Sequence, residues 1–174
     1  MNIKEGIEKR FSVRAFTKEV PDMKLIGEIL KTANAAPSGG NIQPWKVYVL
    51  NKKAKNNLAK ETLQNFDTGV QEEIEYDIYP KPLADEYKKR RYECGADMYN
   101  ALSIEKDDLD SRFKQIRENY NFFGAPIGMI ITIDRSFGSN GWGHVGMFLE
   151  NLWLSAIHFG LGLCLQESWS IYPK

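Results

Sequence analysis

The sequence predicts an α+β fold in a single domain that spans residues 1–174. Apolar residues recur at helical spacing between residues 22 and 35 and again between residues 141 and 159. Two apolar runs, residues 45–51 and 127–133, have the composition of strands. A length of 174 residues is enough for one hydrophobic core and short for two, which favours a single domain.

The N-terminal third contains alternating short elements. Residues 3–9 are compatible with a short helix, and residues 10–16 alternate polar and apolar side chains as a short extended segment does. Asp22 is a plausible N-cap for the helix that follows and stops near residue 35. Residues 36–44 have the composition of a loop and lead into the strand predicted at residues 45–51.

The middle of the chain is polar. A helical pattern covers residues 52–66, whereas residues 67–82 contain a glycine and two prolines that exclude a long regular element. Residues 83–103 and 104–120 are predicted to form two charge-rich helices that are apolar on one side only. We therefore expect both of these helices to be peripheral.

The C-terminal third is apolar. Residues 127–133 form a nearly continuous apolar run, which predicts a central strand buried on both faces. Residues 141–159 are apolar around most of the helix circumference, so we expect burial on most sides, partly by a second subunit of a homodimer. Gly160 is expected to end this helix in the left-handed conformation.

Composition excludes several classes of partner. Lys plus Arg and Asp plus Glu both number 23, so no net field would attract nucleic acid or an acidic membrane surface. The sequence has no apolar run long enough for a membrane span and no signal-like N-terminus. Cys94 and Cys164 lack the spacing of a metal site, which favours reduced thiols, no metal and a cytoplasmic location.

The first candidate site is the basic segment at residues 10–14 (RFSVR). In an extended segment Arg10, Ser12 and Arg14 share one face, and Phe11 and Val13 point toward the core. At roughly 3.3 Å per residue, the Cα atoms of Arg10 and Arg14 are about 13 Å apart, which suits an elongated anion such as FMN. Taken alone, the segment fits a basic surface strand better than a cofactor site.

The second candidate site is the loop at residues 36–45 (APSGGNIQPW). Gly39 and Gly40 allow a ligand to approach the backbone closely, and Ser38 and Asn41 supply polar groups. Pro44 is expected to hold Gln43 in an extended conformation. Such a stiff polar loop suits a flat heterocycle, although clusters of this composition are usually plain turns.

Together these motifs resemble the nitroreductase family. In that family an Arg-x-Ser-x-Arg/Lys segment precedes a Pro-Ser-x-x-Asn-x-Gln-Pro-Trp loop, and residues 10–14 and 37–45 match both in order. Residues 123–126 (FGAP), 147–152 (MFLENL) and 160–167 (GLGLCLQE) match three further family segments. The resemblance implies a mostly antiparallel sheet flanked by helices in an intertwined homodimer.

The resemblance also implies which residues bind FMN. Arg10 and Ser12 match positions at the FMN phosphate, and Arg14 matches a position near the ribityl chain and the N1/O2 side of the ring. The cofactor-binding residues that the resemblance implies on the second loop and at the C-terminus are Pro37, Ser38, Gly39, Asn41, Gln166, Glu167 and Ser168. Those of the loop would approach the flavin from the other subunit, and the last three would pass its N5 edge.

The function implied is that of an oxidoreductase, a flavoprotein that passes hydride from NADH or NADPH through the flavin to a nitroaromatic or quinone-like acceptor by a ping-pong mechanism. No catalytic side chain is required, because the flavin carries the hydride and Arg14 tunes its electrostatics. The alternatives are another flavin reaction on the same fold, namely dehalogenation or flavin destruction, and a non-catalytic flavin-binding protein.

The likeness to the nitrobenzoate-reductase-like branch extends to an insertion resembling residues 79–123. Within it, residues 88–91 (KKRR) could touch a substrate carboxylate or the phosphate of NADPH, although such runs are usually solvated. Four aromatic residues could line an acceptor pocket, with core or interface packing as the alternative: Tyr79, Tyr87, Trp142 and Trp169. Relatives continue beyond a segment like residues 169–174 into a further helix and strand, so we expect the C-terminal strand to be missing.

Overall fold

The computed structural model describes residues 2–173, which divide into two compact units. The first unit contains Met1–Asn57 and Gly124–Leu165, and the second contains Leu58–Phe123 and Gln166–Lys174. The chain therefore leaves the first unit in its middle and returns to it through Gly124. A single domain over the whole chain stays a prediction.

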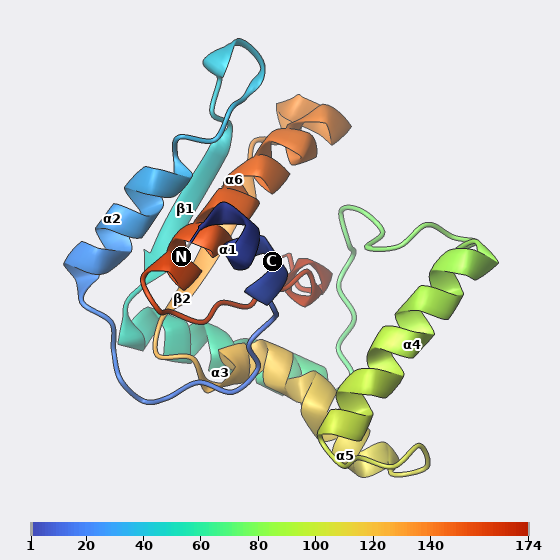
Figure 1. The fold of residues 1–174 in the computed structure, drawn as a ribbon. Coiled ribbons are helices and arrows are strands. Elements are labelled where there is room, and N and C mark those ends of the chain that lie inside the picture. The colour runs from blue at the N-terminus through green and yellow to red at the C-terminus, as the bar shows by residue number, and fades with distance from the viewer. Residues whose placement is uncertain (1, 174) are drawn as a thin grey trace. The chain divides into compact units, whose positions relative to one another are not determined.

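The first unit is built around one long helix, α6 (Gly138–His158), shown in orange in Figure 1. The other elements of this unit are α1 (Ile3–Lys9), α2 (Met23–Ala33), the 3-10 helices Gly39–Asn41 and Arg135–Phe137, β1 (Trp45–Leu50), β2 (Gly128–Ile133) and the start of α3 (Lys52–Asp67). Helices α1 and α2 and both strands contact α6.

Local capping explains where these helices begin and end. Asn2 and Glu5 form a capping box at the start of α1, and the Asp22 side chain accepts from the backbone N–H of Lys24 at the start of α2. Gly160, with φ +77°, ends α6, and the N–H of Leu161 donates to the carbonyl of Ala156 in a Schellman motif. The predicted Asp22 cap and Gly160 stop are both confirmed.

The sheet of the described residues has two antiparallel strands, β1 and β2, in a register that runs from Trp45 opposite Ile133 to Leu50 opposite Gly128. The prediction that residues 127–133 form a central strand buried on both faces is wrong for these residues. In β2 only Gly128 is buried, and the other positions are half-buried. Among the described residues β1 is the only strand paired with β2, so β2 is an edge strand and not a central one.

The core of the first unit lies between α2, α6 and β1. Ile29, Phe148 and Leu152 are almost completely buried, and Phe148 stacks on Trp45 with ring centroids 5.0 Å apart. The opposite face of α6 is open: Met147 is 39% exposed. Within one chain α2 and the sheet cover only part of the apolar surface of α6, and the expectation that a second subunit covers the rest stays a prediction.

The second unit is helical and centred on aromatic rings. Its helices are the rest of α3, α4 (Asp85–Ala101), α5 (Leu109–Arg117) and the 3-10 helices Glu118–Gly124 and Ser168–Ile171. Tyr120 contacts Phe66, Trp169 and Tyr172 through ring pairs with centroids 5.0 to 5.8 Å apart. Trp169 thus belongs to this aromatic core, which was the alternative considered for it.

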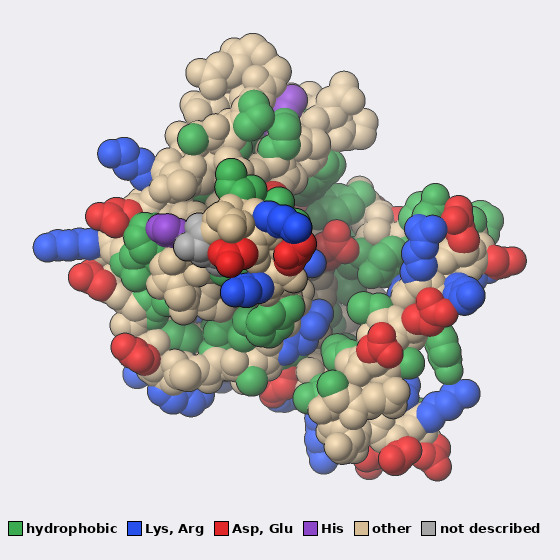
Figure 2. All heavy atoms as spheres, viewed as in Figure 1, with side chains coloured by type: hydrophobic (Ala, Val, Ile, Leu, Met, Phe, Trp, Pro, Cys, Tyr) green, Lys and Arg blue, Asp and Glu red, His purple; other side chains and the backbone are tan. Residues whose placement is uncertain are grey.

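Helix α4 is peripheral, as predicted. It has no buried residue, and Figure 2 shows cationic and anionic side chains interspersed over it. The prediction for residues 104–120 was too long, because α5 begins only at Leu109 after the Asp108 cap. No helix of the described residues is long and apolar enough to cross a membrane.

Candidate functional site

Residues 10–14 are fixed to α6 and to the segment that follows it. Arg10 leaves α1 in an extended conformation, and its guanidinium carbon lies 4.4 Å from the centroid of the Trp153 ring. The backbone N–H of Val13 donates to the carbonyl of Leu163 over 3.1 Å. A Cβ on Gly162 would lie 2.8 Å from the Val13 side chain, so only glycine permits this approach.

The side chains of this segment do not alternate as expected. Phe11 is 66% exposed, so the prediction that it faces the core is wrong. The segment has no strand assignment, and Val13 fills the space beside Gly162. Because one backbone hydrogen bond does not impose a strand's alternation, Phe11 can turn outward while Val13 packs inward.

The polar groups of the segment suit an anionic ligand. Ser12 is half-buried, Arg14 is exposed, and the Arg14 Nη1 donates to the Ser12 carbonyl over 3.4 Å. Two guanidinium groups and a hydroxyl within five residues form a donor set that matches phosphate oxygens. Burial raises the pKa of the neighbouring Cys164 thiol, and the charge of Arg14 opposes that rise. The residues present therefore fit a phosphate-bearing cofactor.

The loop at residues 36–45 is fixed through its own polar groups. The Ser38 Oγ accepts from the backbone N–H of Gln43 over 2.9 Å, and the Gln43 amide donates to the carbonyl of Asn34 over 3.3 Å. Gln43 has φ +49°, so the prediction of an extended conformation is wrong. The two hydrogen bonds hold it in the left-handed region against the preference that Pro44 imposes.

This loop rests against α6 at His144, which the sequence did not single out. A Cβ on Gly39 would lie 3.4 Å from the His144 Cε1 atom. The His144 Nδ1 atom is buried and has no hydrogen-bond partner among the described residues. A lone histidine on an apolar helix carries no local signal of such a contact, because the contact depends on a loop about 100 residues earlier in the chain.

The two candidate segments contact opposite sides of α6. His144 contacts the loop and Trp153 contacts Arg10, and nine residues of helix separate these two positions. Nine residues correspond to about 2.5 turns and about 14 Å along the axis. Within the first unit, α6 therefore separates residues 10–14 from the loop at residues 36–45.

The third predicted segment, residues 166–168, belongs to the second unit. The Gln166 amide donates to the carbonyl of Asn119 over 2.8 Å, and the Trp169 Nε1 donates to the Gln166 Oε1 over 3.4 Å. The Glu167 carbonyl accepts from the backbone N–H of Ser170. The Ser168 hydroxyl is buried without a partner among the described residues.

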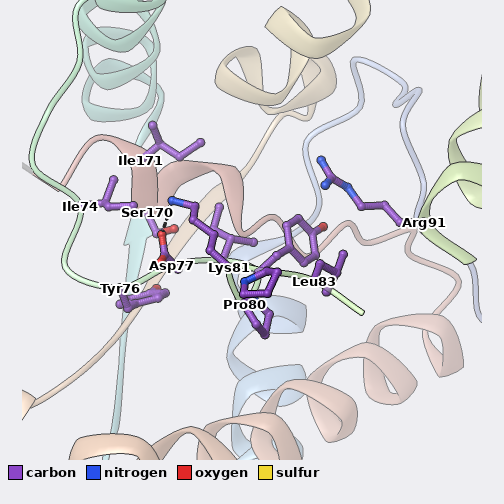
Figure 3. Close-up of a pocket in the computed structure, with 12 residues that line it drawn as sticks. Ile74, Tyr76, Asp77, Pro80, Lys81, Leu83, Arg91, Ser170 and Ile171 are labelled. Carbon is purple, nitrogen blue, oxygen red and sulfur yellow. Dashed lines mark hydrogen bonds and ion pairs between the residues drawn. The ribbon is translucent and has the colours of Figure 1, made fainter. Parts of the chain in front are cut away.

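The second unit also contains a pocket of about 390 Å³, shown in Figure 3. It lies between the irregular segment at residues 74–83, the side chain of Arg91 on α4, and residues 170–171. In Figure 3 Arg91 lies at the same end of the pocket as Leu83, whereas Ile74 and Ile171 lie at the other end. The guanidinium carbon of Arg91 is 4.5 Å from the Tyr79 ring centroid.

Comparison with known proteins identifies the family. The sequence profile of the nitroreductase family matches residues 7–172, a range that contains all the predicted site residues. The chain belongs to the nitroreductase family. The predicted resemblance is therefore confirmed for almost the whole chain.

Two curated relatives and one solved structure show how far the likeness extends. The chain is 34% identical to a 4-nitrobenzoate reductase of Nocardioides sp. over 93% of this chain and 67% of the relative. It is 30% identical to a nitrobenzene nitroreductase of Ectopseudomonas oleovorans over 97% of this chain and 75% of the relative. The crystal structure of an FMN and NADPH-dependent nitroreductase, NfnB, from Sphigopyxis sp. strain HMH matches with a TM-score of 0.93 and 35% identity.

This structural match covers 99% of this chain and 78% of that protein, and it confirms the predicted α+β nitroreductase fold. The roles of the individual residues in binding FMN stay predictions. Sequence reasoning missed the contacts of His144 with Gly39 and of Trp153 with Arg10. The available signal was that α6 is apolar around most of its circumference, which indicated that other segments must cover it.

Proposed function

We propose that this member of the nitroreductase family is an FMN-dependent oxidoreductase that reduces nitroaromatic compounds with NADH or NADPH. The observation that carries the proposal is the fixed position of residues 10–14, held by the Arg10–Trp153 stack and by the Val13–Leu163 hydrogen bond. The solved relative is named as FMN and NADPH-dependent, and the two curated relatives are named for reducing nitroarenes. Its cytoplasmic location stays a prediction from cysteine usage.

In this proposal Arg10 and Ser12 hold the FMN phosphate, and Arg14 lies on the ribityl and N1/O2 side. Because Arg10 is stacked on Trp153, its guanidinium loses little side-chain freedom when it binds the phosphate. Bound FMN would supply hydride transfer from the nicotinamide to the acceptor in two separate half-reactions, a ping-pong cycle. Arg14 would favour the negative charge that reduction adds near N1 and O2.

The proposal includes a homodimer in which each site takes residues from two chains. Pro37, Ser38, Gly39 and Asn41 would contribute to the flavin held by the partner's residues 10–14. The opposite-side contacts of His144 and Trp153 on α6 support this arrangement, because α6 separates the two segments within one chain. The exposed apolar face of α6, including Met147, is the surface that a second copy would cover.

Gln166, Glu167 and Ser168 would present backbone groups to the flavin edge that exchanges hydride. The hydrogen bonds from Gln166 to Asn119 and from Trp169 to Gln166 hold this segment in the second unit. The Ser168 hydroxyl, which is buried without a partner in the described residues, is a further group that a ligand could satisfy. Quinones are proposed as secondary acceptors because they share the planar, electron-poor character of nitroarenes.

One set of measurements tests the proposal. Protein purified with added FMN should show a flavin absorption spectrum, lose it on anaerobic titration with NADH or NADPH, and regain it when a nitroarene is added. Parallel initial-rate plots would support the ping-pong cycle. Protein that binds no FMN would contradict the proposal. If the bound FMN is not reduced by NADH or NADPH, the proposed oxidoreductase activity is refuted and the chain is a flavin-binding protein only.

A further inference from the structure

We propose that the pocket of the second unit binds the carboxylate of an aromatic acceptor through Arg91. This inference rests on the proposed function and adds the substrate class: nitroarenes that carry an acidic group, such as 4-nitrobenzoate. The residues that carry it are the cation Arg91, its stacking partner Tyr79, and the apolar side chains Ile74, Pro80 and Leu83.

The pocket has the size and surface for one aromatic ring. Its volume of about 390 Å³ is at the lower end of the range for small-molecule sites. Ile74, Pro80 and Leu83 give the lining apolar side chains along its length, and Figure 3 shows Ile74 at the opposite end from Leu83. A single-ring acceptor therefore suits the hollow, with its acidic group directed toward the guanidinium.

Arg91 differs from the other cations of its run. On α4, Lys88 pairs with Asp85 at 2.9 Å and Arg90 pairs with Glu86 at 3.2 Å. Lys89 lies 3.8 Å from Glu93 in the same way. Within the part of the chain that the structure describes, Arg91 has no carboxylate partner and contacts the Tyr79 ring instead. The run of four cations thus presents one uncompensated charge, and that charge lines the pocket.

The other charged residues of the pocket do not cancel Arg91. Lys81 and Asp77 both line it, but they pair with each other at 2.6 Å, as the dashed line in Figure 3 shows. The net charge of the lining is therefore positive by one. A guanidinium stacked on an aromatic ring keeps its in-plane N–H groups available, and these match the two oxygens of a carboxylate.

The proposal distinguishes two kinds of nitroarene that relatives are named for. One relative is named for 4-nitrobenzoate, which is an anion, and another for nitrobenzene, which is neutral. Identities of 34% and 30% do not separate these alternatives for this chain. The uncompensated Arg91 favours the anion, because its guanidinium attracts a carboxylate and has no charge to attract on neutral nitrobenzene.

Direct binding tests the proposal on FMN-loaded protein. Equilibrium dialysis would give the Kd of 4-nitrobenzoate and of nitrobenzene for the wild type, Arg91→Gln and the matched control Arg90→Gln. We expect Arg91→Gln to weaken 4-nitrobenzoate binding about five- to tenfold, which is modest because Arg91 is exposed, and to leave nitrobenzene binding unchanged. Arg90→Gln removes an equal charge from the same helix but not from the pocket, so it should change neither value.

Several outcomes would overturn the proposal. Equal weakening of both ligands would mean a loss of pocket shape, and an unchanged Kd for 4-nitrobenzoate in Arg91→Gln would remove the assigned contact. A change confined to NADPH binding would assign Arg91 to the electron donor instead. Competition by benzoate against 4-nitrobenzoate in the wild type is a second supporting measurement that requires no variant, and failure of benzoate to compete would count against the site.

The two proposals can fail separately. Charge-selective binding that depends on Arg91, without turnover of any nitroarene by NADH or NADPH, would remove the proposed function and keep the pocket assignment. Turnover of 4-nitrobenzoate and nitrobenzene with no selectivity that depends on Arg91 would keep the function and remove the pocket assignment.

Discussion

The cofactor segment of the first unit and the pocket of the second unit are supported very differently. Residues 10–14 rest on α6, whose Phe148 and Leu152 are almost completely buried. The pocket lies beside α4, which has no buried residue, and beside an irregular segment whose Tyr79 is 44% exposed. The cofactor segment is therefore anchored to a packed core, whereas the pocket depends on a few surface contacts.

This difference matches what each region must do. A cofactor does not change between relatives, so its ligands gain from a rigid support that fixes their positions. Acceptors do differ between relatives, as the names 4-nitrobenzoate reductase and nitrobenzene nitroreductase indicate for two of them. Exposed loops and peripheral helices can change sequence at little cost in stability, which makes them suited to selecting the acceptor.

The largest effect is expected from the core. Phe148→Ala should reduce the free energy of unfolding by about 3–5 kcal/mol, because it removes a ring that is 1% exposed and stacked on Trp45. The matched change in the second unit is Phe113→Ala, since that ring is 48% exposed and stacked on Phe66. Phe113→Ala should reduce the free energy of unfolding by about 1 kcal/mol. Urea unfolding followed by circular dichroism checks both, and equal costs would refute the contrast between the units.

The second effect concerns the close approach at Gly162. In Gly162→Ala the new Cβ would lie 2.8 Å from the Val13 side chain, which should displace residues 10–14. If the whole overpacking cost of about 1–3 kcal/mol opposes binding, the Kd of FMN rises about five- to 150-fold. Fluorescence titration with FMN measures this change.

Two further variants control this experiment. Gly27→Ala places a Cβ in α2 with nothing within 4 Å, so FMN affinity should stay at the wild-type value. In the double variant Val13→Ala, Gly162→Ala the collision is removed, and affinity should recover in part. A Gly162→Ala protein that binds FMN normally would show that the segment can shift without consequence.

A smaller effect is expected at Arg14. Arg14→Ala should lower the midpoint potential of bound FMN by about 30 mV, which corresponds to about 1.5 kcal/mol for one charged hydrogen bond. Arg14→Lys keeps the charge and should retain most of the potential. Spectroelectrochemistry at saturating FMN gives both values, and an unchanged potential in Arg14→Ala would exclude this role.

The smallest effect is expected at the surface of the second unit. A hydrogen bond from Arg117 holds the pKa of the Asp67 carboxyl below its ordinary value, with Nε and Nη2 at 2.7 and 2.8 Å from its oxygens. Because the folded pKa is depressed, this pair stabilises the fold above the unfolded pKa and is lost as pH falls through the folded value. Asp67→Asn should lower the melting temperature slightly at pH 7 and flatten its decline below about pH 4; an unaltered pH profile would refute the assignment.

Several features could be predicted from the sequence because they depend on neighbours in the chain. The Asp22 cap and the left-handed Gly160 follow from backbone groups within a few residues. The order of the family motifs also required only the sequence, and it was sufficient to identify the fold and the segments of the candidate site.

Other features depended on residues far apart in the chain. Val13 packs beside Gly162, which lies about 150 residues later in the chain, and Gly39 lies against His144, which lies about 100 residues later. No local pattern encodes such contacts, since their energy arises only when distant segments are brought together.

The basic segment at residues 10–14 and the run at residues 88–91 illustrate the same division. The sequence determined that both were cationic, and it could not distinguish a ligand site from a solvated surface in either. Tertiary structure decided which cations are compensated: Arg90 has a carboxylate partner on α4, whereas Arg91 stacks on Tyr79 and Arg10 on Trp153. Charge is a property of the residue type, but the availability of that charge depends on what the folded chain places beside it.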